Sequence, residues 1–159
     1  MSKYKTRGAV FIVSGFILVI FSFFALYVVP KMFAPPTKIF IGNGAFDAKL
    51  ALDTPSREKG LAGVNQLDSG EALLMVFEYE SDWGIWMKNM KFPIDIVWLD
   101  EAKKVVHIVK NASPEYSTDK TFKPNKPAKY VLELPAGTVD SNTINLNSLA
   151  IFQLEEGVE

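Results

Sequence analysis

Asp95 is the first candidate for chemistry, because it is a single carboxylate within the apolar run Ile94-Asp-Ile-Val-Trp-Leu99. An ionised carboxylate in such surroundings is costly unless hydrogen-bond donors or a cation meet it, and the nearest candidates are Lys88, Asn89 and Arg57. One interpretation is therefore a ligand-binding or catalytic role, and the other is a turn-bracing carboxylate that binds backbone amides near Pro93. The residues predicted to bind a ligand are Arg57, Lys88, Asn89 and Asp95.

Glu133 is a second carboxylate in apolar surroundings, in Tyr130-Val-Leu-Glu-Leu134. Paired carboxylates in contrasting environments can serve as general acid and general base. Asp95 and Glu133, flanked by Lys88 and Arg57, would then form the site of a hydrolase or a lyase. Glu133 could equally point outward from a half-buried strand, so the sequence leaves open whether the protein is an enzyme.

Other catalytic and metal-binding chemistry has little support in the sequence. Cysteine is absent, so a thiolate nucleophile and a cysteine-type zinc site are excluded. The one histidine, His107, shares a strand face with Val105 and Val109, which favours a partly buried structural residue. Acidic residues alternate over positions 78–82, a pattern more typical of solvated edge charges than of a calcium site. We predict no metal site and no cofactor.

An uncharged segment covers residues 8–29 and is long enough to span a membrane. A helix of that length, rising about 1.5 Å per residue, crosses the roughly 30 Å hydrocarbon core. Lys3, Lys5 and Arg7 precede it, so the positive-inside rule places residues 1–7 in the cytoplasm. We predict a single-pass protein of the cell membrane whose C-terminal domain lies outside. A cleaved signal peptide is the alternative, but the apolar run is longer than is usual for one.

The charge balance of the exported part excludes one class of partner. Beyond residue 31 the chain has all eighteen acidic residues but only thirteen of its seventeen basic residues, a net charge of −5. Neutralising phosphates requires a basic surface. We therefore predict no nucleic-acid partner, and the lipid bilayer is the partner expected for residues 8–29.

Residues 38–159 are predicted to form one extracytoplasmic domain after a proline-rich linker at 30–37. Trp86 and Trp98 are expected to be buried in a central hairpin. Several short strands and one short helix predict a mostly β, α+β fold, either a small antiparallel barrel or a sandwich. The expected strands are 38–41, 46–52, 73–77, 85–90, 94–99, 105–109, 130–134 and 149–154, and the expected helix is 54–60.

Several of these residues together resemble a known family. They are Arg57 with Gly60-Leu61, Met75, Phe77, Trp86-Met-Lys-Asn-Met-Lys-Phe-Pro-Ile-Asp95 and Val131-Leu-Glu-Leu-Pro-Ala-Gly137. This pattern resembles the DUF192 family, also called UPF0127, over roughly residues 46–154. The resemblance implies a compact, mostly β domain, usually exported or tethered behind one hydrophobic segment, and it implies no reaction.

The sequence departs from that family in two places. Many relatives have a pair of cysteines in the loop that corresponds to residues 114–121, and this chain has none. Relatives usually have Gly-Asp before the last strand, where this chain has Leu146-Asn147.

Three functions remain open from the sequence. The favoured one is a membrane-tethered binding or accessory module for a small molecule, a glycan or an envelope protein. The alternatives are the carboxylate-based hydrolase or lyase and a purely structural envelope protein. Geometry discriminates among them, since Arg57, Lys88, Asn89 and Asp95 should meet at a cleft in a binding protein or an enzyme.

Overall fold

The computed structural model describes residues 17–22, 36–116 and 120–154. The chain divides into two compact units, residues 1–35 and residues 36–159. Residues 17–22 are helical, and in the described parts of the chain no helix is long and apolar enough to cross a membrane. The remainder of the predicted 8–29 span, with residues 1–7 and most of the linker, lies outside the described residues.

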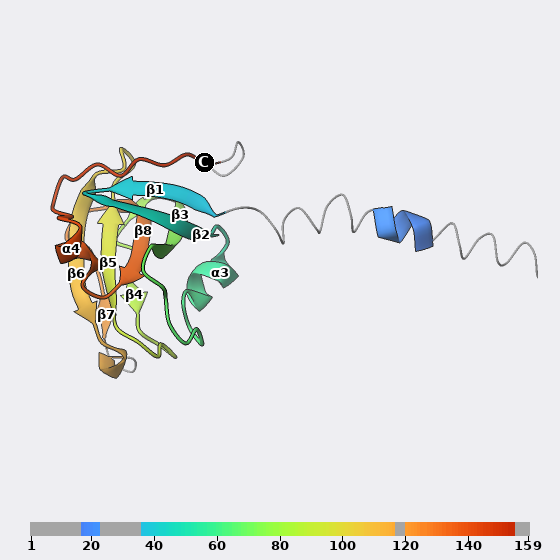
Figure 1. Cartoon of the computed structure of the whole chain (residues 1–159), viewed down its shortest axis with the longest axis horizontal. Coiled ribbons are helices and arrows are strands. Elements are labelled where there is room, and N and C mark those ends of the chain that lie inside the picture. Colours follow the sequence, from blue (N-terminus) through green and yellow to red (C-terminus); the bar gives the residue numbers. More distant parts are fainter. Residues whose placement is uncertain (1–16, 23–35, 117–119, 155–159) are drawn as a thin grey trace, which may run out of the picture. The chain divides into compact units, whose positions relative to one another are not determined.

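The second unit is built on a mixed six-stranded sheet with the order β1-β2-β3-β8-β5-β6 (Figure 1). Neighbouring strands are antiparallel except for β2 and β3, which are parallel because the chain crosses over through α3 and a long loop. The strands of this sheet are β1 (Thr37–Ile41), β2 (Gly44–Ala51), β3 (Glu71–Ser81), β5 (Ile94–Leu99), β6 (Val105–Ala112) and β8 (Ala128–Pro135).

Short elements complete the domain. They are the helices α3 (Thr54–Lys59) and α4 (Thr138–Ser141), the 3-10 turn η2 (Pro114–Tyr116), and a separate pair of strands, β4 (Ile85–Trp86) and β7 (Thr121–Phe122). The mostly β, α+β class is confirmed. The expected small antiparallel barrel or sandwich is corrected to one mixed sheet, which over the described residues does not close into a barrel.

β5 is a central strand, as its apolar sequence predicts, with β8 on one side and β6 on the other. The predicted hairpin before it is wrong, because β4 has only two residues and pairs with β7. After β4 the chain turns, with Asn89 at φ 58° and the amide of Met90 donating to the carbonyl of Met87. A positive φ is incompatible with an extended strand, so residues 87–93 form a loop.

Two hydrophobic clusters cover the two faces of this sheet. We call one the closed face; it includes Val97, Leu99, Leu132, Leu134 and Val139, and residues 144–152 add to it. We call the other the cleft face; it includes Met75, Phe77, Ile96, Trp98 and Val131. Trp98 is fully buried here, as predicted, whereas Trp86 is 48% exposed and its predicted burial is wrong.

The C-terminal segment hydrogen-bonds to both outer strands of the sheet. Ile151 exchanges two backbone hydrogen bonds with Phe40 of β1, and Asn147 and Ser148 bond to Val105 of β6. These contacts are isolated bridges and do not make the regular last strand that the sequence predicts at 149–154. The segment therefore covers the edges of the closed face and leaves the cleft face to other elements.

Candidate functional site

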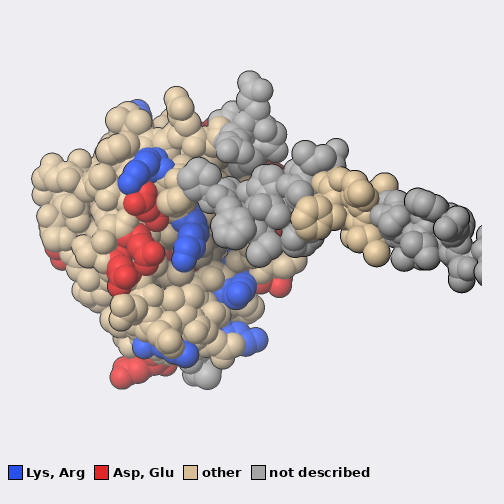
Figure 2. Space-filling view, turned by 45° about the vertical axis from the view of Figure 1, so that its right-hand side comes forward, with Lys and Arg blue, Asp and Glu red and all other residues tan. Residues whose placement is uncertain are grey.

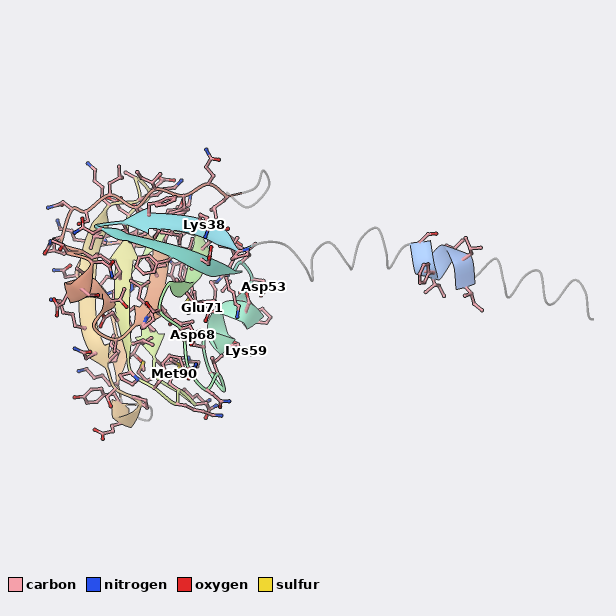
Figure 3. All side chains as sticks on the ribbon, viewed as in Figure 1. Lys38, Asp53, Lys59, Asp68, Glu71 and Met90 are labelled. Atoms are coloured by element: carbon pink, nitrogen blue, oxygen red, sulfur yellow. The ribbon has the colours of Figure 1, made fainter. Side chains whose placement is uncertain are left out.

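A cleft of about 430 Å³ lies on the cleft face of the sheet. One side is α3 and the turn after it, a second is the end of β3, and a third is the segment 83–90. Lys59 and Met90, which are labelled in Figure 3, mark two of these sides. The lining residues used below are Arg57, Glu58, Lys59, Gly60, Met75, Phe77, Glu78, Tyr79, Trp83, Trp86, Lys88 and Glu133.

The α3 side is fixed by a capped helix start. Asp53 is the N-cap, its carboxylate accepts from the amide of Ser56 at 2.8 Å, and the Ser56 hydroxyl accepts from the amide of Asp53. Pro55 occupies the first turn, where a missing N–H costs nothing. These features allow a helix of six residues to keep a defined position beside the sheet.

Arg57 ties this helix to β3 and to the residue that follows β2. Its Nη1 donates to the carbonyl of Leu52 at 2.6 Å and to that of Val76 at 2.8 Å, and Nη2 donates to Thr54 Oγ1 at 3.3 Å. The guanidinium carbon also lies 5.0 Å from the ring centre of Phe77. Arg57 is thus a fixed part of the cleft wall, with much of its donor capacity already used.

Aromatic rings form the opposite side of the cleft. Phe77 and Trp83 stack with ring centres 4.2 Å apart and planes at 9°, and Tyr79 packs against Trp83 at 5.2 Å. The Trp83 indole N–H donates to the carbonyl of Tyr79, and the indole N–H of buried Trp98 donates to the carbonyl of Trp83 at 2.8 Å. The wall is therefore anchored to the core and does not need a ligand to order it.

Trp86 and Lys88 lie at the mouth of the cleft. The Lys88 ammonium is 5.3 Å from the ring centre of Trp86, within the range of a cation–π contact. Asn89 lies just outside, in a shallower hollow shared with Trp86 and Lys88, and its carbonyl accepts from the amide of Gly63. An exposed indole beside a cleft is a surface on which a ligand can pack.

Glu133 projects from β8 into the cleft and is 3% exposed. Its Oε2 has no hydrogen-bond partner in the described parts of the chain, and burial raises the pKa of this carboxyl to about 8. At neutral pH the side chain is therefore mostly a neutral acid. Gly60 adjoins it with φ 49°, and a Cβ there would lie 3.3 Å from the Met75 methyl and 3.8 Å from Glu133 Oε2. A glycine at this position keeps the space beside the carboxyl open.

Asp95 lies on the other face of the sheet. It pairs with Leu134 of β8 in register, whereas Glu133 pairs with Ile96, so the two carboxylates point in opposite directions. Asp95 accepts from the amide of Asn111 at 2.9 Å and from that of Val139 at 2.8 Å. The proposed acid–base pair of Asp95 and Glu133 is therefore wrong on geometric grounds.

Those two amides explain why the strand contains a carboxylate. The β5–β6 register shifts between Ile94 and Ile96, and Asn111, at φ 52°, lies in this irregular stretch of β6. Val139 is in the first turn of α4, whose amides lack intrahelical partners. Asp95 satisfies one amide from each element, so it binds backbone amides as one interpretation predicts. These amides belong to β6 and α4 and not to the turn at Pro93, and they differ from the expected partners Lys88, Asn89 and Arg57.

The predicted site residues thus divide between two places. Arg57 and Lys88 line the cleft together with Glu133, Asn89 lies at its outer margin, and Asp95 is on the closed face. Sequence reasoning missed the ring wall and ranked Glu133 below Asp95. No sequence signal separates the two carboxyls, because Asp95 and Glu133 are each the one charged residue in a strand run that is buried throughout.

The remaining charged candidates have other partners. Asp82 pairs with Lys123 at 2.9 Å, and Glu80 accepts from the amide of Glu101 at 2.7 Å, so the acidic run 78–82 does not converge. Within the described ranges no three acidic, histidine or cysteine side chains are grouped to hold a metal ion. His107 is half-buried and packs edge-on against Trp98, with ring centres 5.3 Å apart.

Comparison with known proteins places this fold among others of unknown function. The DUF192 family model, described as an uncharacterized ACR, matches residues 37–149. None of the curated proteins compared with the chain matches it.

The crystal structures similar to this chain include the following two. One is a protein of Sinorhizobium meliloti 1021, provisionally described as a transcription regulator, with 25% identity, a TM-score of 0.69, and coverage of 73% of this chain and 92% of its own. The other is a protein of unknown function from Novosphingobium aromaticivorans DSM 12444, with 23% identity, a TM-score of 0.67, and coverage of 73% and 83%. The chain, through residues 37–149, belongs to the DUF192 family of uncharacterised proteins.

Proposed function

We propose that the domain is a binding module that holds a small organic molecule in the cleft between α3, β3 and residues 83–90. The observation that carries this proposal is Glu133, a buried carboxyl whose Oε2 has no hydrogen-bond partner among the described residues and which lines a cleft walled by aromatic rings. Buried polar groups are normally hydrogen-bonded, so an unpaired one that faces a cleft is explained by a ligand that supplies the partner.

The size and lining of the cleft support a small molecule. Ligand sites typically enclose about 300–1,000 Å³, with a mainly apolar lining and a few polar groups that fix orientation. The cleft has a volume of about 430 Å³ and combines Phe77, Tyr79 and Trp83 with Glu133 and Lys88. Of the partners expected from the sequence, an envelope protein or a long glycan would need a larger surface.

The other functions have weaker support. A hydrolase or lyase built on Asp95 and Glu133 is not supported, because the sheet separates the two carboxylates. The regulator description belongs to the Sinorhizobium protein. Figure 2 shows acidic and basic side chains interspersed on the face in view, where a nucleic-acid surface would be mainly basic.

We also propose that residues 8–29 tether this module to a membrane, with residues 38–159 outside the cell. The support is the uncharged sequence of that segment and the three basic residues before it. A protease added to intact cells should release the domain. Cleavage only after lysis would contradict this orientation.

The binding proposal is tested by thermal unfolding of the full chain with a panel of small aromatic and polyhydroxylated compounds. A compound that binds the folded state raises the melting temperature. Trp86→Ala should remove the shift, because the indole packs at the cleft mouth. The matched control is Phe40→Ala, whose ring is 51% exposed on β1, compared with 48% for Trp86. A shift retained in Trp86→Ala, or no shift with any compound, would contradict the proposal.

A further inference from the structure

We propose that the cleft selects organic cations, binding a primary ammonium or guanidinium group against Glu133 and the apolar body of the molecule against the rings. This inference rests on the proposed binding function and specifies its ligand class. It is carried by the geometry at the base of the cleft.

Glu133 defines what the base of the cleft can bind best. Its Oε2 is buried with no hydrogen-bond partner within residues 36–116 and 120–154, and its cross-strand neighbours Leu73 and Ile96 are uncharged. A neutral hydroxyl could supply one ordinary hydrogen bond, whereas a cation supplies a charge-assisted bond, which is about twice as strong. An anion could accept one hydrogen bond from the O–H of the protonated acid, but it could not form an ion pair and would be repelled by the ionised carboxylate.

The ring wall favours the same class of ligand. Aromatic rings attract cations through their electron-rich faces. Two rings that line the cleft already have a cation near the ring centre. The guanidinium of Arg57 is 5.0 Å from Phe77, and the ammonium of Lys88 is 5.3 Å from Trp86. The apolar part of a ligand would contact the exposed side of Trp86, Tyr79 and Met75, which would exclude water from the ion pair.

The other charged groups of the cleft leave the base to Glu133. Besides Glu133 the lining has three basic and two acidic side chains, a net charge of +1. One of the basic groups, Arg57, is held in the cleft wall by three acceptors. Asp95 of the neighbouring strand faces away. The charged and titratable side chains that line the cleft with Glu133 are Arg57, Glu58 and Lys59 from the α3 region, Glu78 and Tyr79 from β3, and Lys88.

Binding of a cation should release a proton. In the empty cleft Glu133 is mostly the neutral acid at pH 7, because burial raises its pKa to about 8. When an ammonium group binds, the carboxyl loses its proton to the buffer, and the carboxylate and ammonium form the ion pair. Affinity should therefore rise with pH through about pH 8, where half of the empty sites are ionised, and level off above that value.

The test compares three probes of similar shape on the full chain by titration calorimetry. They are benzylamine as the cation, benzyl alcohol as the neutral donor, and benzoate as the anion. At pH 7 we expect benzylamine to bind at least about tenfold more tightly than either of the others. Titrations in two buffers with different ionisation enthalpies should show proton release with benzylamine alone.

Two variants test whether Glu133 causes the preference for benzylamine. Glu133→Gln should weaken benzylamine binding about tenfold and change benzyl alcohol binding little, whereas Asp95→Asn, on the closed face, should change neither. Should Glu133→Gln fail to fold, the proton release of the unmodified chain still decides the question. Equal or tighter binding of benzyl alcohol or benzoate would overturn cation selection and leave the binding function standing. No binding by any of the three would overturn both.

Discussion

The two faces of the sheet each have one buried carboxyl, and the two groups have opposite environments. Asp95 on the closed face is fully buried and accepts two backbone hydrogen bonds. Glu133 on the cleft face is 3% exposed, and its Oε2 has no hydrogen-bond partner among the residues that the structure describes. Burial alone therefore does not distinguish a structural carboxyl from a functional one. The satisfaction of its hydrogen bonds does.

The same contrast applies to two tryptophans. Trp98 is fully enclosed between β8 and β6, and its indole N–H is used to anchor the ring wall. Trp86 is half exposed at the mouth of the cleft and contacts Lys88. The indole of Trp98 stabilises the core, whereas the indole of Trp86 is accessible to a ligand.

The largest effect should come from Trp98→Ala, which removes a buried ring from the cleft-face core. We expect a loss of roughly 3–5 kcal/mol in the free energy of unfolding, measured in denaturant. The control is Trp86→Ala, which should cost less than about 1 kcal/mol because the indole is half exposed. Similar losses in the two variants would remove the distinction between a structural and an available indole.

The next effect is a pH dependence of the free energy of unfolding, produced by Glu133. Its folded-state pKa, about 8, is above the ordinary value of 4.5, so the folded chain holds a proton that the unfolded chain has lost between these values. The contribution of Glu133 to the free energy of unfolding is therefore greatest below about pH 4.5 and decreases as the pH rises to about 8. Relative to Glu133→Gln, the unmodified chain should lose roughly 3 kcal/mol between pH 4.5 and pH 7. Parallel pH profiles for the two proteins would contradict the assignment.

Asp95→Asn should have a smaller effect of about 1–3 kcal/mol, in the destabilising direction. The amide keeps one acceptor oxygen but turns its NH₂ group toward the second backbone donor, so the bond from Asn111 or from Val139 is lost. Denaturant unfolding measures the cost, and hydrogen exchange at those two amides locates it. A variant as stable as the unmodified chain, with both amides still protected, would show that Asp95 is not the brace of the closed face.

These contrasts also show how far the sequence alone can lead. The nearly continuous apolar run of residues 94–99 correctly predicts a central strand, because a strand that is apolar on both faces has to be covered on both sides. The predicted hairpin is wrong because a local pattern does not reveal the left-handed turn at Asn89 or the distant partner β7. Pairing between remote strands is set by the whole sheet.

The candidate site was predictable only in part for the same reason. Arg57 and Lys88 do line the cleft, but the cleft exists because α3, the end of β3 and residues 83–90 meet over β8. Which of two buried carboxyls finds donors depends on the irregular register at Asn111 and on the start of α4. Neither feature is encoded near Asp95 or Glu133 in the sequence.

The central claim is that Glu133 is an unpaired acid facing a ligand cleft, and a carbon-13 NMR titration of its side-chain carboxyl tests this most directly. The resonance is identified by its absence from Glu133→Gln. We predict a titration midpoint near pH 8 in the free protein. A midpoint near 4.5 would show that the carboxyl is already solvated or paired, and would contradict the account of the cleft.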